Sequence, residues 1–421
     1  MEFLIGAAFA LYTAAAPASL AVPGRANANP SAAADGRTVA VAWAASEPGG
    51  ATDIYVAVSR DGGGTFGDPV RVNDIAGDAR VSGEQPPRLI VRTPNRLAVA
   101  WVSTRDGTTI RVAQSADGGR TFAPSIAVSQ AGAPGNRGWH AMDVNARGDI
   151  EVVWLDHRAM AGHEHHHTAG AGHGTRDGAA MARLSAIYAA RVRADGRVEP
   201  ERQIATGVCY CCKTAIAAVT DGSIVAAWRH VYAGNFRDIA FTRAADGRRF
   251  AAPLRVSADE WRLDGCPDDG PAIAVDGGNR THLVWPTRVT ENGEPTIALF
   301  YAQSRDGRTF TERQRLPTEG VAHHPQLVVR RDGGVQAVWD ESGDGARTIA
   351  SATANVDGRG VARFTRVSLD GVTSASYPAL AAGSDGVVLA WSDASEDPST
   401  IRVTRLGSTS MNLARGATPA R

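Results

Sequence analysis

A short apolar run that ends in tryptophan recurs seven times along the chain. The copies end at Trp43, Trp101, Trp154, Trp228, Trp285, Trp339 and Trp391, with spacings of 58, 53, 74, 57, 54 and 52 residues. Turn-forming Asp, Gly and Asn residues bound these runs, and four to eight apolar residues bounded in this way are typical of a buried β-strand. The chain is therefore expected to repeat one β-sheet unit seven times.

A period near 50 residues in a chain rich in short strands is typical of β-propeller blades. We predict an all-β, seven-bladed propeller over residues 29–410 as a single domain, with six blades as the alternative if one unit is irregular. The seventh unit lacks a clear fourth strand, which residues near Leu20-Ala21-Val22 would supply if they are retained. A His-rich insert occupies about 159–180 within the 74-residue interval, and 411–421 is expected to be a flexible tail.

The turns between the third and fourth strands carry a family resemblance. They read Ser-Arg-Asp-Gly-Gly-Gly-Thr-Phe at 59–66, Ser-Ala-Asp-Gly-Gly-Arg-Thr-Phe at 115–122 and Ser-Arg-Asp-Gly-Arg-Thr-Phe at 304–310. These turns resemble the Asp-box (BNR) repeats of sialidase-like β-propellers. In such a turn the Asp accepts backbone N–H groups, Gly supplies a positive φ, and the aromatic residue packs between strands. Asp boxes indicate a fold and do not identify an active site.

The N-terminus and the net charge limit where this protein works and what it binds. Residues from Phe3 to about Leu20 are apolar, which predicts a signal peptide over 1–28, cleaved after Ala16, Ala18 or Ala28. We therefore expect a periplasmic or secreted protein. With 44 basic and 44 acidic residues the net charge is zero, which argues against a nucleic-acid partner. No other stretch is long and apolar enough to span a bilayer.

Strand alternation places two sets of loops on one face of the propeller, around the central channel. These are the loops that precede the first strand of each blade and those that follow the second. Every cysteine and ten of the eleven histidines fall in them, while His282 lies within a strand. Cys209, Cys211 and Cys212 precede Cys266 by about one blade, so we expect their loops to face each other.

Thiolates and imidazoles gathered in this way are ligands that copper(I) and zinc prefer. We predict a site that binds or handles a soft metal ion, with copper favoured over zinc, or that supports metal-dependent redox chemistry. The candidate ligands are Cys209, Cys211, Cys212, Cys266, His163, His165, His166, His167, His323 and His324. An even number of cysteines in an exported chain leaves disulfides as the alternative.

The sialidase resemblance implies a different chemistry. That family uses arginines that grip a substrate carboxylate, a tyrosine nucleophile aided by a glutamate, and an aspartate acid/base. The run Ser-Tyr377-Pro-Ala-Leu is similar to the family's Tyr-Ser-x-Leu, which makes Tyr377 the candidate nucleophile. The candidate arginines are Arg88, Arg137, Arg229 and Arg288.

The chain departs from the family at its first blade, where the Phe/Tyr-Arg-Ile-Pro motif is missing, and no Glu or Asp partner is assigned. Two further hypotheses therefore stand beside the metal site. One is a sialidase-like exo-glycoside hydrolase. The other is a non-catalytic propeller that binds a glycan or another exported protein.

Overall fold

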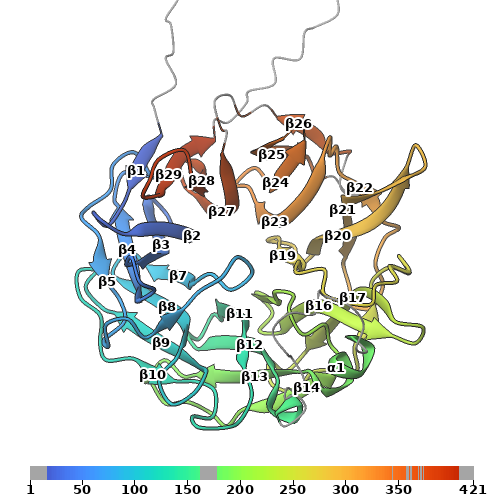
Figure 1. The fold of residues 1–421 in the computed structure, drawn as a ribbon, viewed down its shortest axis with the longest axis horizontal. Helices are drawn as coiled ribbons and strands as arrows, with labels where there is room; N and C mark the ends of the chain where they lie inside the picture. Colours follow the sequence, from blue (N-terminus) through green and yellow to red (C-terminus); the bar gives the residue numbers. More distant parts are fainter. Residues whose placement is uncertain are drawn as a thin grey trace, which may run out of the picture.

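The repeated units form seven β-sheets arranged around a central channel (Figure 1). The computed structural model describes residues 17–161 and 178–406, except 344, 357–359, 361–362, 368, 370–371 and 373. Within these residues the prediction of a seven-bladed, all-β propeller is confirmed. The first strand of each blade lines the channel, and the later strands follow outward (Figure 1).

Blades 1 to 3 use the first half of the chain. Blade 1 consists of β2 (Ala26–Asp35), β3 (Thr38–Ser46), β4 (Thr52–Ser59) and β5 (Val70–Arg71). Blade 2 consists of β7 (Arg88–Thr93), β8 (Arg96–Ser103), β9 (Thr109–Ser115) and β10 (Ile126–Ala127), with β6 (Ala79–Arg80) also paired to β8. Blade 3 consists of β11 (Arg137–Val144), β12 (Ile150–Asp156), β13 (Ala186–Val192) and β14 (Arg202–Thr206).

Blades 4 to 6 repeat the same antiparallel order. Blade 4 consists of β15 (Ala215–Ala218), β16 (Ile224–Tyr232), β17 (Phe236–Ala244) and β18 (Leu254–Arg255). Blade 5 consists of β19 (Ala272–Val275), β20 (Thr281–Glu291), β21 (Glu294–Ser304) and β22 (Gln314–Arg315). Blade 6 consists of β23 (Val321–Val329), β24 (Val335–Gly343), β25 (Ala346–Ala354) and β26 (Thr365–Val367).

The two ends of the described chain meet in blade 7. Its strands are β27 (Ala375–Gly383), β28 (Gly386–Asp393), β29 (Thr400–Leu406) and β1 (Ala18–Leu20). Ser19 pairs with Arg402 and Leu20 with Ile401, so an N-terminal strand closes the ring as anticipated. Because β1 and the start of β2 lie within 1–28, the propeller begins before residue 29. Cleavage after Ala16 leaves β1 in place, whereas cleavage after Ala28 removes it.

The core is divided into seven clusters, each between two neighbouring blades. The second strand of a blade is covered on both faces, which explains why its sequence is continuously apolar instead of alternating. The seven repeated tryptophans are at most 3% exposed. Their predicted place in the core is confirmed.

The repeated turns have the expected local geometry. Asp61 accepts hydrogen bonds from the backbone N–H groups of Gly64 and Thr65, both at 2.9 Å, and from the Ser59 hydroxyl at 2.7 Å. Phe66 packs into the cluster between blades 7 and 1. The turns therefore fix the strand ends and add an aromatic residue to each blade interface. They do not by themselves assign the chain to the sialidase-like family.

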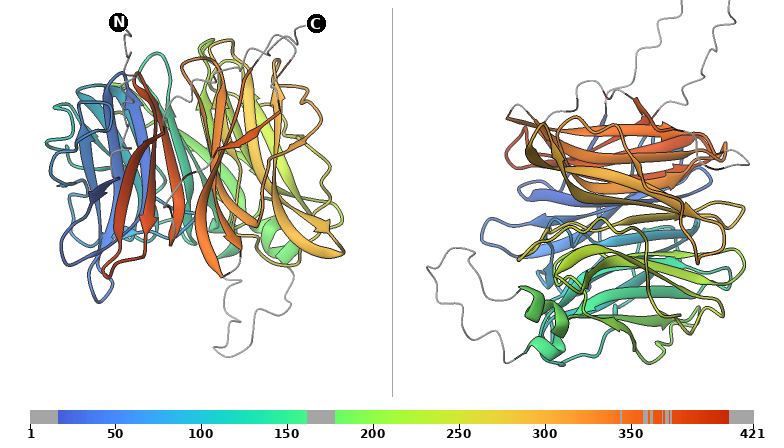
Figure 2. Two further views of the ribbon diagram at one scale, coloured as in Figure 1. Left: turned by 90° about the horizontal axis from the view of Figure 1, so that it is seen from above. Right: turned by 90° about the vertical axis from the view of Figure 1, so that its right-hand side faces the viewer.

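Two short helices, η1 (Arg158–Met160) and α1 (Gly178–Leu184), lie between β12 and β13 in blade 3 (Figure 2). Among the described residues, neither helix is long and apolar enough to cross a membrane. The candidate ligands His163, His165, His166 and His167 lie outside the described residues, as does the tail from 407 onward.

Candidate functional site

Four inner strands carry the same kink near their first residues, at the end of the channel that we call the funnel. The register shifts within β2, β11, β23 and β27. Each of these strands contains a non-glycine residue with φ between 50° and 56°, namely Asn29, Trp139, His324 and Tyr377. Such conformations cost about 1–3 kcal/mol each and cluster at functional sites. These four strained residues indicate that the funnel is the place to look for a functional site.

Lys213 is buried in the funnel between two carboxyl groups from different blades. Its Nζ atom lies 3.6 Å from Glu84 Oε1 and 3.9 Å from Asp269 Oδ1, and donates to the carbonyl of Pro325 at 3.1 Å. Its backbone N–H donates to Glu84 Oε2 at 3.0 Å. The loops before β7, β15 and β19 supply these three side chains, so blades 2, 4 and 5 are joined across the channel.

Two consecutive histidines extend this network to blades 6 and 7. Asp269 Oδ2 lies 3.2 Å from His323 Nδ1 and accepts the backbone N–H of His324 at 3.0 Å. His324 Nδ1 lies 2.8 Å from Asp340 Oδ1, and its ring centroid is 4.4 Å from that of Tyr377. We refer to Glu84, Lys213, Asp269, His323, His324, Asp340 and Tyr377 as the funnel cluster.

The two carboxyl groups beside Lys213 have opposite tendencies to hold a proton. Burial raises the pKa of Glu84 more than the nearby Lys213 cation lowers it. Burial also acts to raise the pKa of Asp269, but the hydrogen bond from His323 and the charges of His324 and Lys213 hold it below its usual range. Glu84 is therefore suited to donate a proton and Asp269 to remain ionised.

The funnel cluster reaches solvent through an imidazole and a phenol. The His323 side chain is 27% exposed, and Tyr377 is partly exposed. A Cβ atom at Gly83 would overlap the Tyr377 hydroxyl, so this hydroxyl lies directly against the residue before Glu84. Glu84 is therefore next in the chain to the residue against which the Tyr377 hydroxyl lies.

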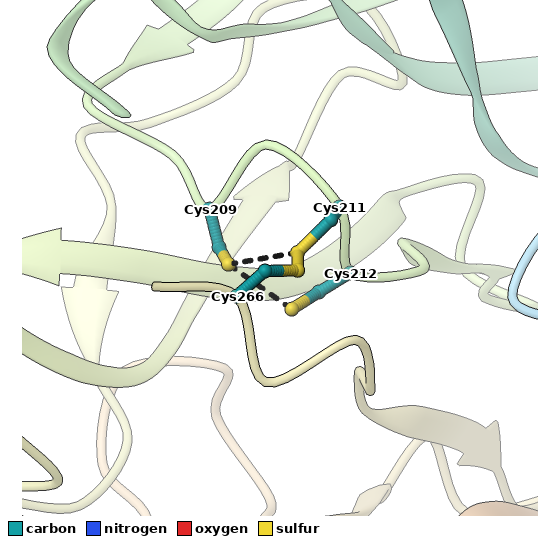
Figure 3. Close-up of side chains that lie close together, drawn as sticks. All are labelled: Cys209, Cys211, Cys212 and Cys266. Carbon is teal, nitrogen blue, oxygen red and sulfur yellow. Dashed lines mark hydrogen bonds between the residues drawn. A yellow bond between two sulfur atoms is a disulfide. The ribbon is translucent and has the colours of Figure 1, made fainter. Parts of the chain in front are cut away.

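The four cysteines form a separate, adjacent group (Figure 3). Their sulfur atoms all lie within 4.8 Å of one another, as the facing loops predicted. Cys211 and Cys266 form a disulfide, while Cys209 and Cys212 are free and buried. The Cys212 thiol donates to Cys209 Sγ at 3.1 Å, and Arg237 Nη1 lies 3.7 Å from the same sulfur. One disulfide and one thiol pair thus share a single pocket of sulfur atoms.

His323 and His324 are not in this sulfur group, although sequence analysis placed them among the ligands. The group within 4.8 Å consists of cysteines, and the two imidazoles contact Asp269 and Asp340 instead. Burial raises the pKa of Cys209, but the hydrogen bond from Cys212 and the Arg237 charge outweigh it and lower that pKa. The sulfur group and the funnel cluster are therefore distinct in their chemistry.

The four candidate arginines do not converge as a carboxylate grip. Arg137 donates to the carbonyls of Thr108 and Ala133 and pairs with Asp156 at 3.3 Å. The Arg229 guanidinium donates to the carbonyls of Asp269, Arg237 and Pro286. Arg288 is exposed. Arg88 donates through Nε to the carbonyl of His140 at 2.9 Å and has a buried Nη2 with no hydrogen-bond partner.

A hollow of about 700 Å³ lies elsewhere, between blades 1 and 2. It is lined by Val56, Arg60, Gly118 and neighbouring residues of the Asp-containing turns. No titratable group of the funnel cluster borders it. We therefore place the candidate site in the funnel, where strained backbone and buried charged groups coincide.

Comparison with known proteins supports the fold. No family model matches the chain, and no curated protein matches it. An ulvan lyase of polysaccharide lyase family PL25 has a TM-score of 0.56 at 11% identity, covering 91% of this chain and 94% of its own. The GH93 α-L-arabinofuranosidase of Fusarium graminearum has a TM-score of 0.50 at 12% identity, covering 93% and 98%.

A protein of unknown function from Dyadobacter fermentans also has a TM-score of 0.50, at 12% identity, covering 94% of this chain and 99% of its own. Likeness at these identities establishes the arrangement of blades and nothing about the residues in the funnel. The chain is a seven-bladed β-propeller whose fold is shared with carbohydrate-active enzymes.

Proposed function

We propose that the funnel cluster binds a polysaccharide and cleaves its glycosidic bonds. The observation that carries this proposal is the carboxyl pair, Glu84 and Asp269. The pair lies on either side of Lys213 and beside the partly exposed His323 and Tyr377. Pairs of this kind separate the acid and base roles that glycoside cleavage needs. The ulvan lyase and the arabinofuranosidase support the proposal because both act on carbohydrates with the same architecture.

Each residue of the funnel has a role in this proposal. Glu84 donates a proton to the leaving oxygen, and Asp269 stays ionised to activate water or to stabilise positive charge. Tyr377 presents its ring and hydroxyl at the partly exposed edge, where it contacts the sugar and is positioned to act as acid, base or nucleophile. Asp340 orients His324, which packs on Tyr377.

Specificity for sialic acid has little support, because Arg137 and Arg229 are occupied by carbonyl groups. The cations that could meet an acidic sugar are Arg88, whose buried Nη2 lacks a hydrogen-bond partner, and the partly exposed Arg347, which lies 3.6 Å from Asp340. The proposal is therefore glycan cleavage in a general sense, and the substrate screen must include neutral and acidic polymers.

The test is to incubate the purified full chain with arabinan, ulvan, pectin and sialylated glycans. New reducing ends report all cleavage, and absorbance of an unsaturated uronate reports elimination alone, so the two readouts distinguish hydrolase from lyase. Glu84→Gln and Tyr377→Phe should each lower kcat by about 10²–10⁴-fold on the substrate that is found.

The matched controls are Glu294→Gln and Tyr55→Phe, which lie outside the funnel and should keep full activity. Binding without cleavage by wild type would contradict the enzyme and favour the glycan-binding alternative. If the protein neither binds nor cleaves any of these polymers, a protein-binding propeller becomes the better hypothesis. Equal activity of Glu84→Gln and wild type would contradict the assigned role of Glu84.

A further inference from the structure

The sulfur group is more compact than one disulfide requires. Cys209 Sγ lies 3.8 Å from Cys211 Sγ and 3.1 Å from Cys212 Sγ, although Cys209 and Cys212 take no part in the disulfide (Figure 3). In a tetrahedral zinc–thiolate site, with Zn–S distances of about 2.3 Å, neighbouring sulfur atoms are about 3.8 Å apart. The protein thus holds four sulfur atoms near the separation that one metal ion requires.

Hydrogen-bond donors surround the sulfur group. Arg237 Nη1 lies 3.7 Å from Cys209 Sγ, while its Nη2 is buried without a hydrogen-bond partner. The backbone N–H of Asp268 donates to Cys266 Sγ at 3.3 Å. A neutral disulfide and two neutral thiols do not compensate the charge of a buried guanidinium. Several thiolates bound to one metal cation carry a net negative charge, which the Arg237 guanidinium would balance.

We propose that reduction of the Cys211–Cys266 disulfide turns the four cysteines into a binding site for one thiophilic d¹⁰ ion, zinc or copper(I). The reductant is a dithiol. It transfers two electrons and two protons to the disulfide, becomes a disulfide itself, and leaves thiols on Cys211 and Cys266. The incoming ion then displaces the thiol protons to solvent and is held by the four sulfur atoms.

The position of the disulfide suits this exchange. Cys266 is exposed, while the other three cysteines are buried. A reductant can therefore attack from the Cys266 side, and the ion has an entry path on the same side. Soft sulfur ligands select zinc or copper(I) over calcium or magnesium. The two candidate ions share this donor chemistry, and coordination measurements distinguish them.

This inference does not rest on glycan cleavage. The proposed metal ligands are the four cysteines alone. The histidines that the sequence predicted as further ligands are not among them, and His323 remains in contact with Asp269. To keep the imidazoles of the insert from binding metal, the test uses the full chain with His163, His165, His166, His167 and His173 replaced by Gln.

The experiment titrates this protein with Zn²⁺ or Cu⁺ under anaerobic conditions, once after dithiol reduction and once in the oxidised form. We expect four free thiols and one ion per chain after reduction, with a sulfur-only shell at about 2.3 Å for zinc in X-ray absorption. The oxidised form should hold two free thiols and bind either ion at least about a hundredfold more weakly. This loss of affinity is larger than that caused by removing a residue which only hydrogen-bonds to a metal ligand.

A Cys209→Ser/Cys212→Ser variant keeps the disulfide and should lose the site in both redox states. Circular dichroism checks that it folds, and the redox comparison in unmutated cysteines does not depend on that variant. If the reduced protein binds one Zn²⁺ but no Cu⁺, or one Cu⁺ but no Zn²⁺, the result supports the site and identifies its ion. Four reduced thiols with no bound ion, a nitrogen or oxygen shell, or equal affinity in both redox states would overturn the proposal.

Discussion

At the scale of single residues, the buried carboxyl pair of the funnel shares one lysine. Lys213 is the only lysine in the chain, and its side chain is 5% exposed beside the almost fully buried Glu84 and Asp269. Removing one partner of a buried charge network leaves the other charges without compensation, which typically costs about 3–5 kcal/mol. The lysine therefore stabilises the arrangement on which the proposed chemistry depends.

We expect Lys213→Met to lower the free energy of unfolding by about 3–5 kcal/mol in urea denaturation, because two carboxyl groups lose their cation. Adding Glu84→Gln to this variant should recover part of the loss, since only one carboxylate then remains to be desolvated. A loss below about 1 kcal/mol for the single variant would show that the network does not stabilise the fold.

At the scale of elements, local sequence determined the fold well. The tryptophan runs became the second strands, and the Asp-containing turns formed their predicted hydrogen bonds, because both depend on residues that are close in the chain. The funnel residues lay in the correct loops, yet the contact of Lys213 with Glu84 joins positions 129 residues apart. Periodicity cannot supply such a pairing.

The candidate arginines also show that the sequence did not specify which groups a side chain contacts. Arg137 begins β11 and Arg229 lies within β16, and sequence analysis placed both in loops around the funnel as candidates for gripping a substrate. Backbone carbonyls hold both guanidinium groups instead. Whether an arginine faces a ligand or its own loop depends on loop conformation, which residue type and spacing do not specify.

Ring closure by β1 gives a prediction at this scale. Leu20 is 6% exposed and packs in the cluster between blades 7 and 1, so Leu20→Ala should lower the free energy of unfolding by about 2–5 kcal/mol. The matched control, Ser19→Ala, changes an exposed side chain in the same strand and should cost less than about 0.5 kcal/mol. Equal stability of both variants in urea would mean that β1 does not close the ring.

At the scale of the whole molecule, buried histidines set the response to acid. Burial lowers the pKa of four imidazoles to about 3 or 4, those of His140, His157, His230 and His282. In the unfolded chain histidine takes up a proton near pH 6.5. The stability that these groups contribute is complete above that pH and is lost as the pH falls toward 4.

Four carboxyl groups and His324 act in the opposite direction. Burial raises the pKa of Glu151 and Asp268, and although burial acts to lower the pKa of the His324 imidazole, the carboxylates near it raise that pKa overall. Burial raises the pKa of Asp143 to about 6 and also raises that of Glu84, so the folded state takes up these protons first as the pH falls.

Because each of the four imidazoles stays unprotonated in the folded chain at pH 5 but is protonated in the unfolded chain, we expect a lower urea midpoint at pH 5 than at pH 7.5. His282→Gln should reduce this difference. An equal or higher midpoint at pH 5 would contradict the buried, neutral state of these histidines.

The central claim is that the funnel is where a glycan is bound and cleaved. The most direct test is a crystal structure of the Glu84→Gln variant with an oligosaccharide of whichever polymer the wild-type protein cleaves. We predict a sugar ring against Tyr377 and His323, with its glycosidic oxygen beside residue 84. A sugar bound in the hollow between blades 1 and 2, or on the outer strands, would contradict the account.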